Sequence, residues 1–211
     1  MSQREYRTFA EPSRKTLKRK DSRFIGVGVP VGTEGELEGQ RKQLTDEFPK
    51  ATHIASASVI LESGRPVDRY DNDGEPSGTA GKPVLQVIKG EDLVNAAIFV
   101  VRYFGGTELG TGGLVRAYSD TAREVIDGAR IVRKQEREKC SVSFPYSFTG
   151  KVAEALSEFD GVVVLERNYG ENPELTLSVP MGDKDRLTGR LKELTSGSVQ
   201  FKGKSSADEV D

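Results

Sequence analysis

The chain has 211 residues, a length that allows one large or two small domains. Its formal net charge of −2 is less basic than we expect of a protein that coats nucleic acid over its whole surface. The single cysteine, Cys140, and the single histidine, His53, exclude an intramolecular disulfide, a multi-cysteine zinc site and a multi-histidine metal centre.

The sequence has no signal for membrane targeting. Its polar start, Met1–Tyr6, lacks the apolar segment of a signal peptide. The longest purely apolar run, Ala96–Val101, has six residues, which is far too short to cross a bilayer. We therefore expect a cytoplasmic protein that does not contact a membrane.

The first 23 residues are strongly basic, with eight arginines and lysines against three acidic side chains. This segment fits a β-hairpin or ribbon with an exposed cationic face, which can meet the phosphates of RNA. The alternative is a solvated sheet edge whose lysines only prevent pairing with another strand.

The next residues predict a strand, a helix and a second strand. Residues 24–31 have apolar side chains at alternate positions, as in a strand. Thr33 and Glu36 have the spacing of a capping box, so a helix is expected to follow and to end before Pro49. Residues 52–61 are read as the next strand, and His53 at its start is either a structural residue or a binding residue.

Residues 68–81 are predicted to form a polar loop. The loop lacks the ligand positions of a calcium-binding EF-hand. Its acidic side chains either bind a cation weakly, or act as acid and base, or only stabilise turns. Ser77 or Thr79 is expected to cap the following helix, which carries Val84, Leu85 and Ile88. The candidate binding residues of this loop are Asp73, Glu75, Ser77, Thr79 and Lys82.

A glycine-rich stretch follows the apolar run at 96–101 and precedes a helical pattern formed by Leu114, Tyr118, Ala122, Val125 and Ala129. Glycines at the start of a helix can expose backbone N–H groups that bind an anion. The stretch lacks the lysine of a P-loop and the third glycine of a dinucleotide-binding fingerprint. It either binds anions or only allows a tight turn. The candidate binding residues are Arg102, Tyr103, Gly105, Gly106, Gly110, Thr111, Gly112, Gly113 and Arg116.

The second half of the chain has a different character. Residues 130–139 are charged and are expected to contain a linker. Strands are predicted at 140–144, 161–169, 174–179 and 199–201, and helices at 150–159 and 183–194. The order strand-helix-strand-strand-helix-strand is that of a ferredoxin-like domain. We therefore predict domains at 1–132 and 137–204, with a disordered tail at 205–211.

Two blocks of residues resemble the signature of the IMPACT family (YigZ-like proteins). The first is the run Asp73–Pro83, and the second is formed by Val100–Gly106 and Leu109–Tyr118. The resemblance implies an α+β protein of two domains. The N-terminal domain would be an α/β sandwich with a left-handed β-α-β connection, related to a ribosomal protein, and the C-terminal domain would be ferredoxin-like. The family has a His-His-Cys segment in many bacterial members where this chain has His53, Ile54 and Ala55, so metal or thiol chemistry is not transferred to this position.

Eukaryotic members of that family act in translational control, by blocking activation of the starvation-sensing general-control kinase. The resemblance therefore implies a regulator of translational initiation in the stress response that binds RNA, the ribosome or a translation protein. One alternative is an enzyme that acts on a phosphorylated small molecule or nucleotide. Another is a module that binds other proteins. No catalytic constellation, metal site or cofactor motif is evident in the sequence, which favours a non-enzymatic role.

Overall fold

The computed structural model describes residues 5–62 and 64–202, which divide into two compact units. Tyr6–Lys134 form the N-terminal unit, and the C-terminal unit begins at Gln135. Both units mix helices and strands, so the predicted α+β class with two domains is confirmed. Arg4 and the tail predicted to be disordered, at 205–211, lie outside the described residues.

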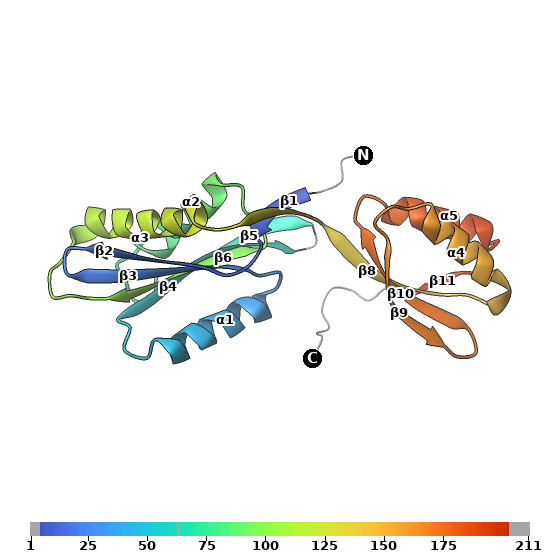
Figure 1. Cartoon of the computed structure of the whole chain (residues 1–211), viewed down its shortest axis with the longest axis horizontal. Coiled ribbons are helices and arrows are strands. Elements are labelled where there is room, and N and C mark those ends of the chain that lie inside the picture. Colours follow the sequence, from blue (N-terminus) through green and yellow to red (C-terminus); the bar gives the residue numbers. More distant parts are fainter. Residues whose placement is uncertain (1–4, 63, 203–211) are drawn as a thin grey trace. The chain divides into compact units, whose positions relative to one another are not determined.

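The N-terminal unit is built on a five-stranded sheet in which each neighbouring pair is antiparallel. The strand order is β2-β3-β6-β4-β5 (Figure 1). The strands are β2 (Ser13–Arg19), β3 (Ser22–Pro30), β4 (His53–Glu62), β5 (Arg65–Asp71) and β6 (Ala96–Tyr103). Because β3 and β4 both run antiparallel to β6, they are parallel to each other, and a helix connects them.

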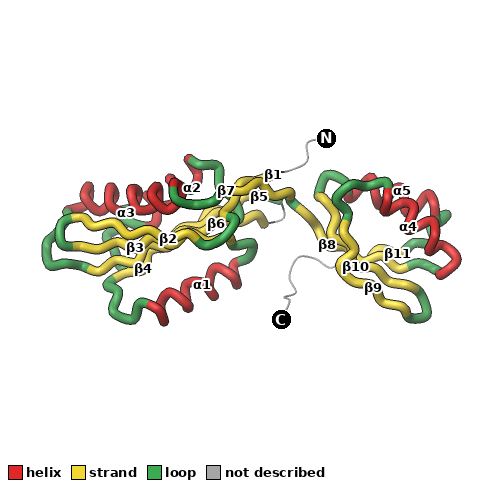
Figure 2. Tube along the Cα trace, in the orientation of Figure 1, coloured by secondary structure: helices red, strands yellow, loops and turns green. Residues whose placement is uncertain are grey.

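Helices cover both faces of this sheet (Figure 2). Helices α2 (Gly81–Gly90) and α3 (Gly110–Asp127) pack on one face, and α1 (Glu34–Glu47) packs on the other. Strand β6 is buried on both sides, which explains why its apolar run shows no polar alternation.

The capping prediction for α1 is confirmed with one change. The Thr33 hydroxyl accepts a hydrogen bond from the Glu36 N–H at 3.2 Å, as a capping box requires. The Glu36 carboxylate accepts from the N–H of Gly32 at 2.6 Å rather than from that of Thr33. The helix ends at Glu47, before Pro49 as expected.

Two boundaries in this unit differ from the prediction. Residues 68–71, predicted as loop, belong to β5, an edge strand with mostly polar, exposed side chains that is held to β4 by backbone pairing. Helix α3 begins at Gly110, so four residues predicted to lie in the glycine loop form its first turn, and Ala129 lies beyond its end. The loop between β6 and α3 is therefore only residues 104–109.

The predicted linker is also structured. Strand β7 (Ile131–Gln135) pairs with β1 (Glu5–Phe9), and β8 (Arg137–Ser143) begins two residues later. Backbone pairing was not expected there because the segment is dominated by charged side chains.

The C-terminal unit has the predicted ferredoxin-like order of elements. After β8 come a 3-10 turn (Tyr146–Phe148), α4 (Thr149–Ser157), β9 (Val163–Tyr169), β10 (Pro173–Pro180), α5 (Lys184–Leu194) and β11 (Gln200–Lys202). The antiparallel sheet has the order β11-β8-β10-β9. Its core joins the sheet to both helices through apolar side chains such as Val152, Leu177 and Leu191. No helix in the described part of either unit is long and apolar enough to span a membrane.

Candidate functional site

The sequence-predicted site residues of the N-terminal unit gather at one end of its sheet. Strand pairing places Arg23 opposite Tyr103 and His53 opposite Arg102, so β3 and β4 begin where β6 ends. The β2–β3 turn, the loop at 72–80 and the loop at 104–109 therefore lie at this end, as do the first turns of α2 and α3. We call residues 18–23, 72–82 and 102–116, together with His53, the loop end.

A buried polar cluster lies at the centre of the loop end. The Arg102 guanidinium donates from Nη1 to Oε1 of Glu75 at 2.6 Å, and the Tyr118 hydroxyl donates to the same oxygen at 2.7 Å. The side chains of Arg102 and Glu75 are only 7% and 2% exposed. The cluster therefore joins three elements through one carboxylate: the loop at 72–80, which we call the acidic loop, the end of β6, and α3.

Aromatic rings surround the Arg102 guanidinium. Its Cζ lies 5.5 Å from the ring centroid of Phe24 and 5.4 Å from that of Phe104. Phe24 also packs edge-on against Tyr118, with centroids 5.3 Å apart. Apolar neighbours strengthen electrostatic interactions, and burial together with the hydrogen bond to Glu75 raises the pKa of Tyr118. The Tyr118 hydroxyl is therefore neutral at physiological pH and acts as a donor.

His53 and Asp73 fix the acidic loop to the start of β4. The Asp73 carboxylate accepts from the N–H of Ile54 at 2.6 Å, and its carbonyl lies 2.6 Å from His53 Nδ1. A carbonyl can only accept, so Nδ1 carries a proton. Nε2 of His53 lies 4.0 Å from Oε1 of Glu75. Among the described residues, no group of three or more histidine, cysteine or acidic side chains has the arrangement of a metal site.

The start of α2 is not capped as we predicted. The side-chain carbonyl of Asn72 accepts from the N–H of Gly81 at 3.0 Å, whereas the Thr79 hydroxyl donates to the Pro76 carbonyl. Neither Ser77 nor Thr79 caps the helix. Thr79 is buried, but Ser77 and Lys82 are exposed, so the outer part of the acidic loop remains accessible.

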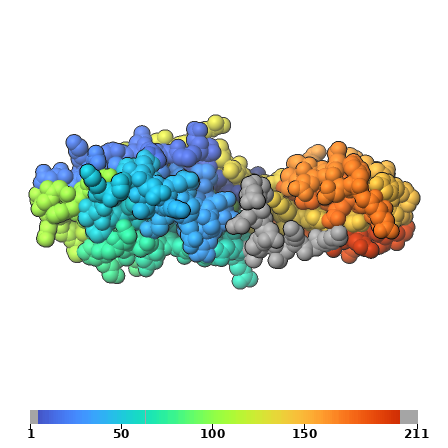
Figure 3. Space-filling view, turned by 90° about the horizontal axis from the view of Figure 1, so that it is seen from below, coloured from blue at the N-terminus to red at the C-terminus, as the bar shows by residue number. Residues whose placement is uncertain are grey.

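The β2–β3 turn forms hydrogen bonds with the loop at 104–109, which we call the glycine loop. The Thr107 hydroxyl donates to Oδ2 of Asp21 at 2.5 Å, and Lys20 Nζ donates to the Glu108 carbonyl at 2.9 Å. A Cβ at Gly105 would lie 2.0 Å from the Asp21 carbonyl oxygen, so only glycine fits this approach. Figure 3 shows blue and light-green residues side by side at one end of the N-terminal unit.

The first turn of α3 contains Gly110, Thr111, Gly112 and Gly113 and has no side-chain cap. Space is open around the Cα atoms of Gly106, Gly110 and Gly112, and Arg116 is exposed in the following turn. The anion site predicted here remains a prediction. Arg102 faces the interior and pairs with Glu75, so any cationic side chain that assists must come from elsewhere, for example from Arg116.

The basic segment forms the predicted hairpin, with β2 on an exposed sheet edge. Three cations among its described residues are ion-paired: Arg7 with Glu91, Arg14 with Glu47, and Arg19 with Asp120 at 3.1 Å. Lys18 and Arg23 are exposed and lie opposite each other on β2 and β3. The Arg23 guanidinium stacks over the ring of the half-buried Tyr103, with 4.5 Å from Cζ to the centroid.

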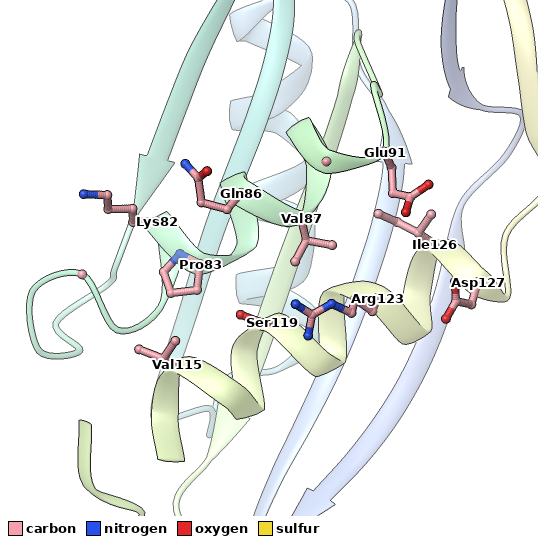
Figure 4. A pocket seen from close by; sticks show the side chains of 12 residues that line it. Lys82, Pro83, Gln86, Val87, Glu91, Val115, Ser119, Arg123, Ile126 and Asp127 are labelled. Carbon is pink, nitrogen blue, oxygen red and sulfur yellow. The ribbon is translucent and has the colours of Figure 1, made fainter. Parts of the chain in front are cut away.

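A groove of about 620 Å³ runs between α2 and α3 (Figure 4). Lys82, Pro83 and Val115 lie at one end of the groove, and Glu91 and Asp127 lie at the other. The two helices thus run in the same direction, with both first turns at the loop end. Of the predicted residues, only Lys82 lines the groove.

The sequence reasoning missed three contributors to the loop end: Asn72, Phe104 and the hydroxyl of Tyr118. Tyr118 was read as a core position, because its helical spacing indicates burial but not a hydrogen bond. Phe104 lies inside the stretch that resembles the IMPACT signature, but no sequence pattern shows that this residue is 45% exposed.

The comparisons with known proteins agree with this two-domain organisation. The family model of the Impact N-terminal domain matches residues 20–126, and a domain of unknown function, DUF1949, matches residues 142–198. The chain therefore belongs to the IMPACT family.

Individual relatives extend over most of the chain. The IMPACT family member YvyE of Bacillus subtilis is 34% identical over 93% of this chain and 90% of its own. The Protein IMPACT homolog of Saccharomyces cerevisiae is 32% identical over 51% of this chain and 42% of its own. A crystal structure of a hypothetical protein aligns with a TM-score of 0.72 and 25% identity, over 96% of this chain and 98% of that one.

Proposed function

We propose that this protein regulates translation in the cytoplasm by binding RNA of the ribosome through the loop end. The observation that carries the proposal is that exposed cations and an uncapped helix start lie at the same end of the sheet. Lys18, Arg23 and Arg116 are exposed there, and α3 begins without a side-chain cap. Lysine and arginine side chains and helix N-termini are the groups that contact phosphates in nucleic-acid complexes.

Family membership supports the translational part of the proposal. The eukaryotic branch implies translational control, and the basic hairpin gives a surface through which such control can reach RNA. Because the chain as a whole is slightly acidic, the binding is expected to be local and salt-sensitive rather than a general affinity for polyanions.

Co-sedimentation with purified ribosomes tests the proposal. The wild type, Lys18→Ala/Arg23→Ala and the charge-matched control Lys42→Ala/Arg65→Ala are compared at low and high salt. Lys42 is exposed on α1, and Arg65 begins β5 at the opposite end of the sheet. We expect the wild type and the control to sediment at low salt and to be released by high salt, because bound cations displace counterions from phosphates. The loop-end variant should stay mainly in the supernatant.

Two results would contradict the proposal. One is that the wild type fails to sediment at low salt. The other is that the loop-end variant sediments as well as the control does. Arg102 is left unchanged in this design because its guanidinium is buried and paired with Glu75. A substitution of Arg102 would disturb folding, and a loss of binding could not then be assigned to the surface.

The groove between α2 and α3 favours a second candidate, the binding of a phosphorylated small molecule. Its volume of about 620 Å³ lies within the range of ligand sites, and Lys82 provides a cation at one end. Thermal-shift measurements with nucleotides and sugar phosphates test this. A rise in Tm that disappears in Lys82→Ala supports it, and no rise at millimolar concentration rejects it.

A further inference from the structure

Two consecutive aromatic side chains at the end of β6 each stack with an arginine, on opposite sides of the sheet. Tyr103 lies under the exposed Arg23, on the face that carries α1. Phe104 lies over the buried Arg102, whose side chain points to the α3 face. This arrangement follows from the pleat, because successive residues of a strand point to opposite faces.

Phe104 is held in place although the residue is 45% exposed. Its N–H donates to the Thr52 hydroxyl at 3.0 Å, and the guanidinium beneath the ring is fixed by Glu75. A single exposed aromatic residue is common on protein surfaces. Here, however, the ring lies over a planar cation that is fixed by Glu75, and it directly follows in sequence the second aromatic residue stacked with an arginine, Tyr103.

Cationic side chains continue from this stack across the sheet. Lys18 on β2 lies opposite Arg23 on β3, and Arg23 lies opposite Tyr103 on β6. The three residues therefore form one row across the sheet. A chain of phosphates that follows this row would reach Tyr103, the last residue of β6, and could pass round the end of the strand to Phe104, the next residue.

Exposed aromatic faces beside lysine and arginine suit unpaired nucleotides. Bases of single-stranded RNA stack on aromatic rings and guanidinium planes, whereas bases inside a duplex are already stacked and paired. We propose that the loop end binds single-stranded RNA, with an unpaired base stacked on Phe104 and phosphates held by Lys18 and Arg23. This inference rests on the proposed function and specifies which form of RNA is bound and by which ring.

Fluorescence anisotropy with two labelled RNAs tests the inference: an unstructured 12-nucleotide strand and a 12-base-pair duplex. The variants are Phe104→Leu, Phe104→Trp, Lys18→Ala and the control Tyr169→Leu. Tyr169 is a strongly exposed aromatic residue of the C-terminal unit. Their folding is checked by thermal unfolding.

The wild type is expected to prefer the single strand. Phe104→Leu should weaken single-strand binding about tenfold, the size expected for losing one stacked base. Its salt dependence should not change, because stacking releases no counterions. The plot of log K against log salt has a negative slope, and Lys18→Ala should make this slope less steep by about 0.7. Phe104→Trp should bind like the wild type, and Tyr169→Leu should have no effect.

A 2-aminopurine base in the single strand gives an independent signal, because stacking on Phe104 should quench its fluorescence, and Phe104→Leu should abolish the quenching. Equal affinity for strand and duplex, with no effect of Phe104→Leu, would overturn this inference while leaving RNA binding intact. Failure of the wild type to bind either RNA, or ribosomes, would instead overturn the proposed function, and this inference with it.

Discussion

The two units of this protein each contain a close arginine–glutamate pair, and the two pairs differ mainly in their surroundings. In the N-terminal unit Arg102 and Glu75 meet at 2.6 Å, with both side chains almost fully buried. In the C-terminal unit Arg190 and Glu158 meet at 2.7 Å through two parallel hydrogen bonds, on the surface. The surface pair has the better hydrogen-bond geometry, but its side chains are 30% and 39% exposed to water.

Solvent exposure, rather than the distance between the two side chains, decides how much such a pair contributes to stability. Breaking a buried pair leaves an uncompensated charge in a medium that solvates it poorly. Breaking an exposed pair returns both charges to water. We therefore expect the buried pair to control the folding of its domain, and the exposed pair to be nearly silent.

The largest expected effect comes from removing the buried carboxylate. Glu75→Ala leaves the Arg102 guanidinium unpaired and should lower the free energy of unfolding of the N-terminal unit by about 3–5 kcal/mol. Urea denaturation followed by circular dichroism measures the change, and hydrogen exchange assigns it to the unit. A loss below about 1 kcal/mol would show that the cluster is not essential for stability.

Tyr118→Phe removes one hydrogen bond to the same carboxylate and keeps the charge pair. We expect a loss of about 1.5–3 kcal/mol, the range for hydrogen bonds to charged groups. The measurement is the same urea titration. Tyr6→Phe, in a half-buried side chain of β1, provides the control for deleting a tyrosine hydroxyl. An equal effect of the two substitutions would argue against a special role of the cluster.

At alkaline pH the N-terminal unit should lose stability through Tyr118. Burial and the Glu75 hydrogen bond raise the pKa of Tyr118 in the folded state, whereas tyrosine in the unfolded chain titrates near about 10. The stabilisation that comes from the neutral Tyr118 hydroxyl is therefore fully present below about pH 10. Above that pH the free energy of unfolding declines, by at most about 1.4 kcal/mol per pH unit. Urea midpoints between pH 9 and 11 should fall more steeply for the wild type than for Tyr118→Phe.

The smallest expected effect is that of Glu158→Gln in the C-terminal unit. The hydrogen bond from Arg190 holds the pKa of Glu158 below its usual value. The stabilisation from this pair is therefore present above the pKa that Glu158 has in the unfolded chain, and it is lost as the pH falls through the lower pKa of the folded state. Because the pair is exposed, we expect no measurable shift of the urea midpoint at neutral pH. A shift as large as that of Glu75→Ala would refute the comparison.

Much of the fold could be predicted because its elements depend on local patterns. The apolar run of β6, the Thr33–Glu36 cap and the order of elements in the C-terminal unit all follow from short-range periodicity. The exposed edge strand β5 was partly missed because its side chains are mostly polar, and its pairing with β4 depends on backbone groups. The start of α3 was placed late because glycines usually indicate a loop.

The candidate site was less accessible to sequence reasoning. Arg102 and Glu75 were both identified as site residues, but they are separated by 27 positions, and no local pattern shows that they pair. Arg102 was expected to present its charge toward an anion at the start of α3. Instead, folding places it between Phe24 and Phe104, and the accessible cations are on the hairpin and on α3.

The pairing of β1 with β7 has a consequence for how such a domain can be reused. The chain enters the N-terminal unit along one of these strands and leaves it along the other, and the N–H of Ala10 donates to the carbonyl of Arg130 at 2.9 Å. A domain whose ends are adjacent can be inserted into another protein with little distortion of either. The N-terminal unit is therefore a candidate for grafting into the surface loop of an unrelated carrier protein.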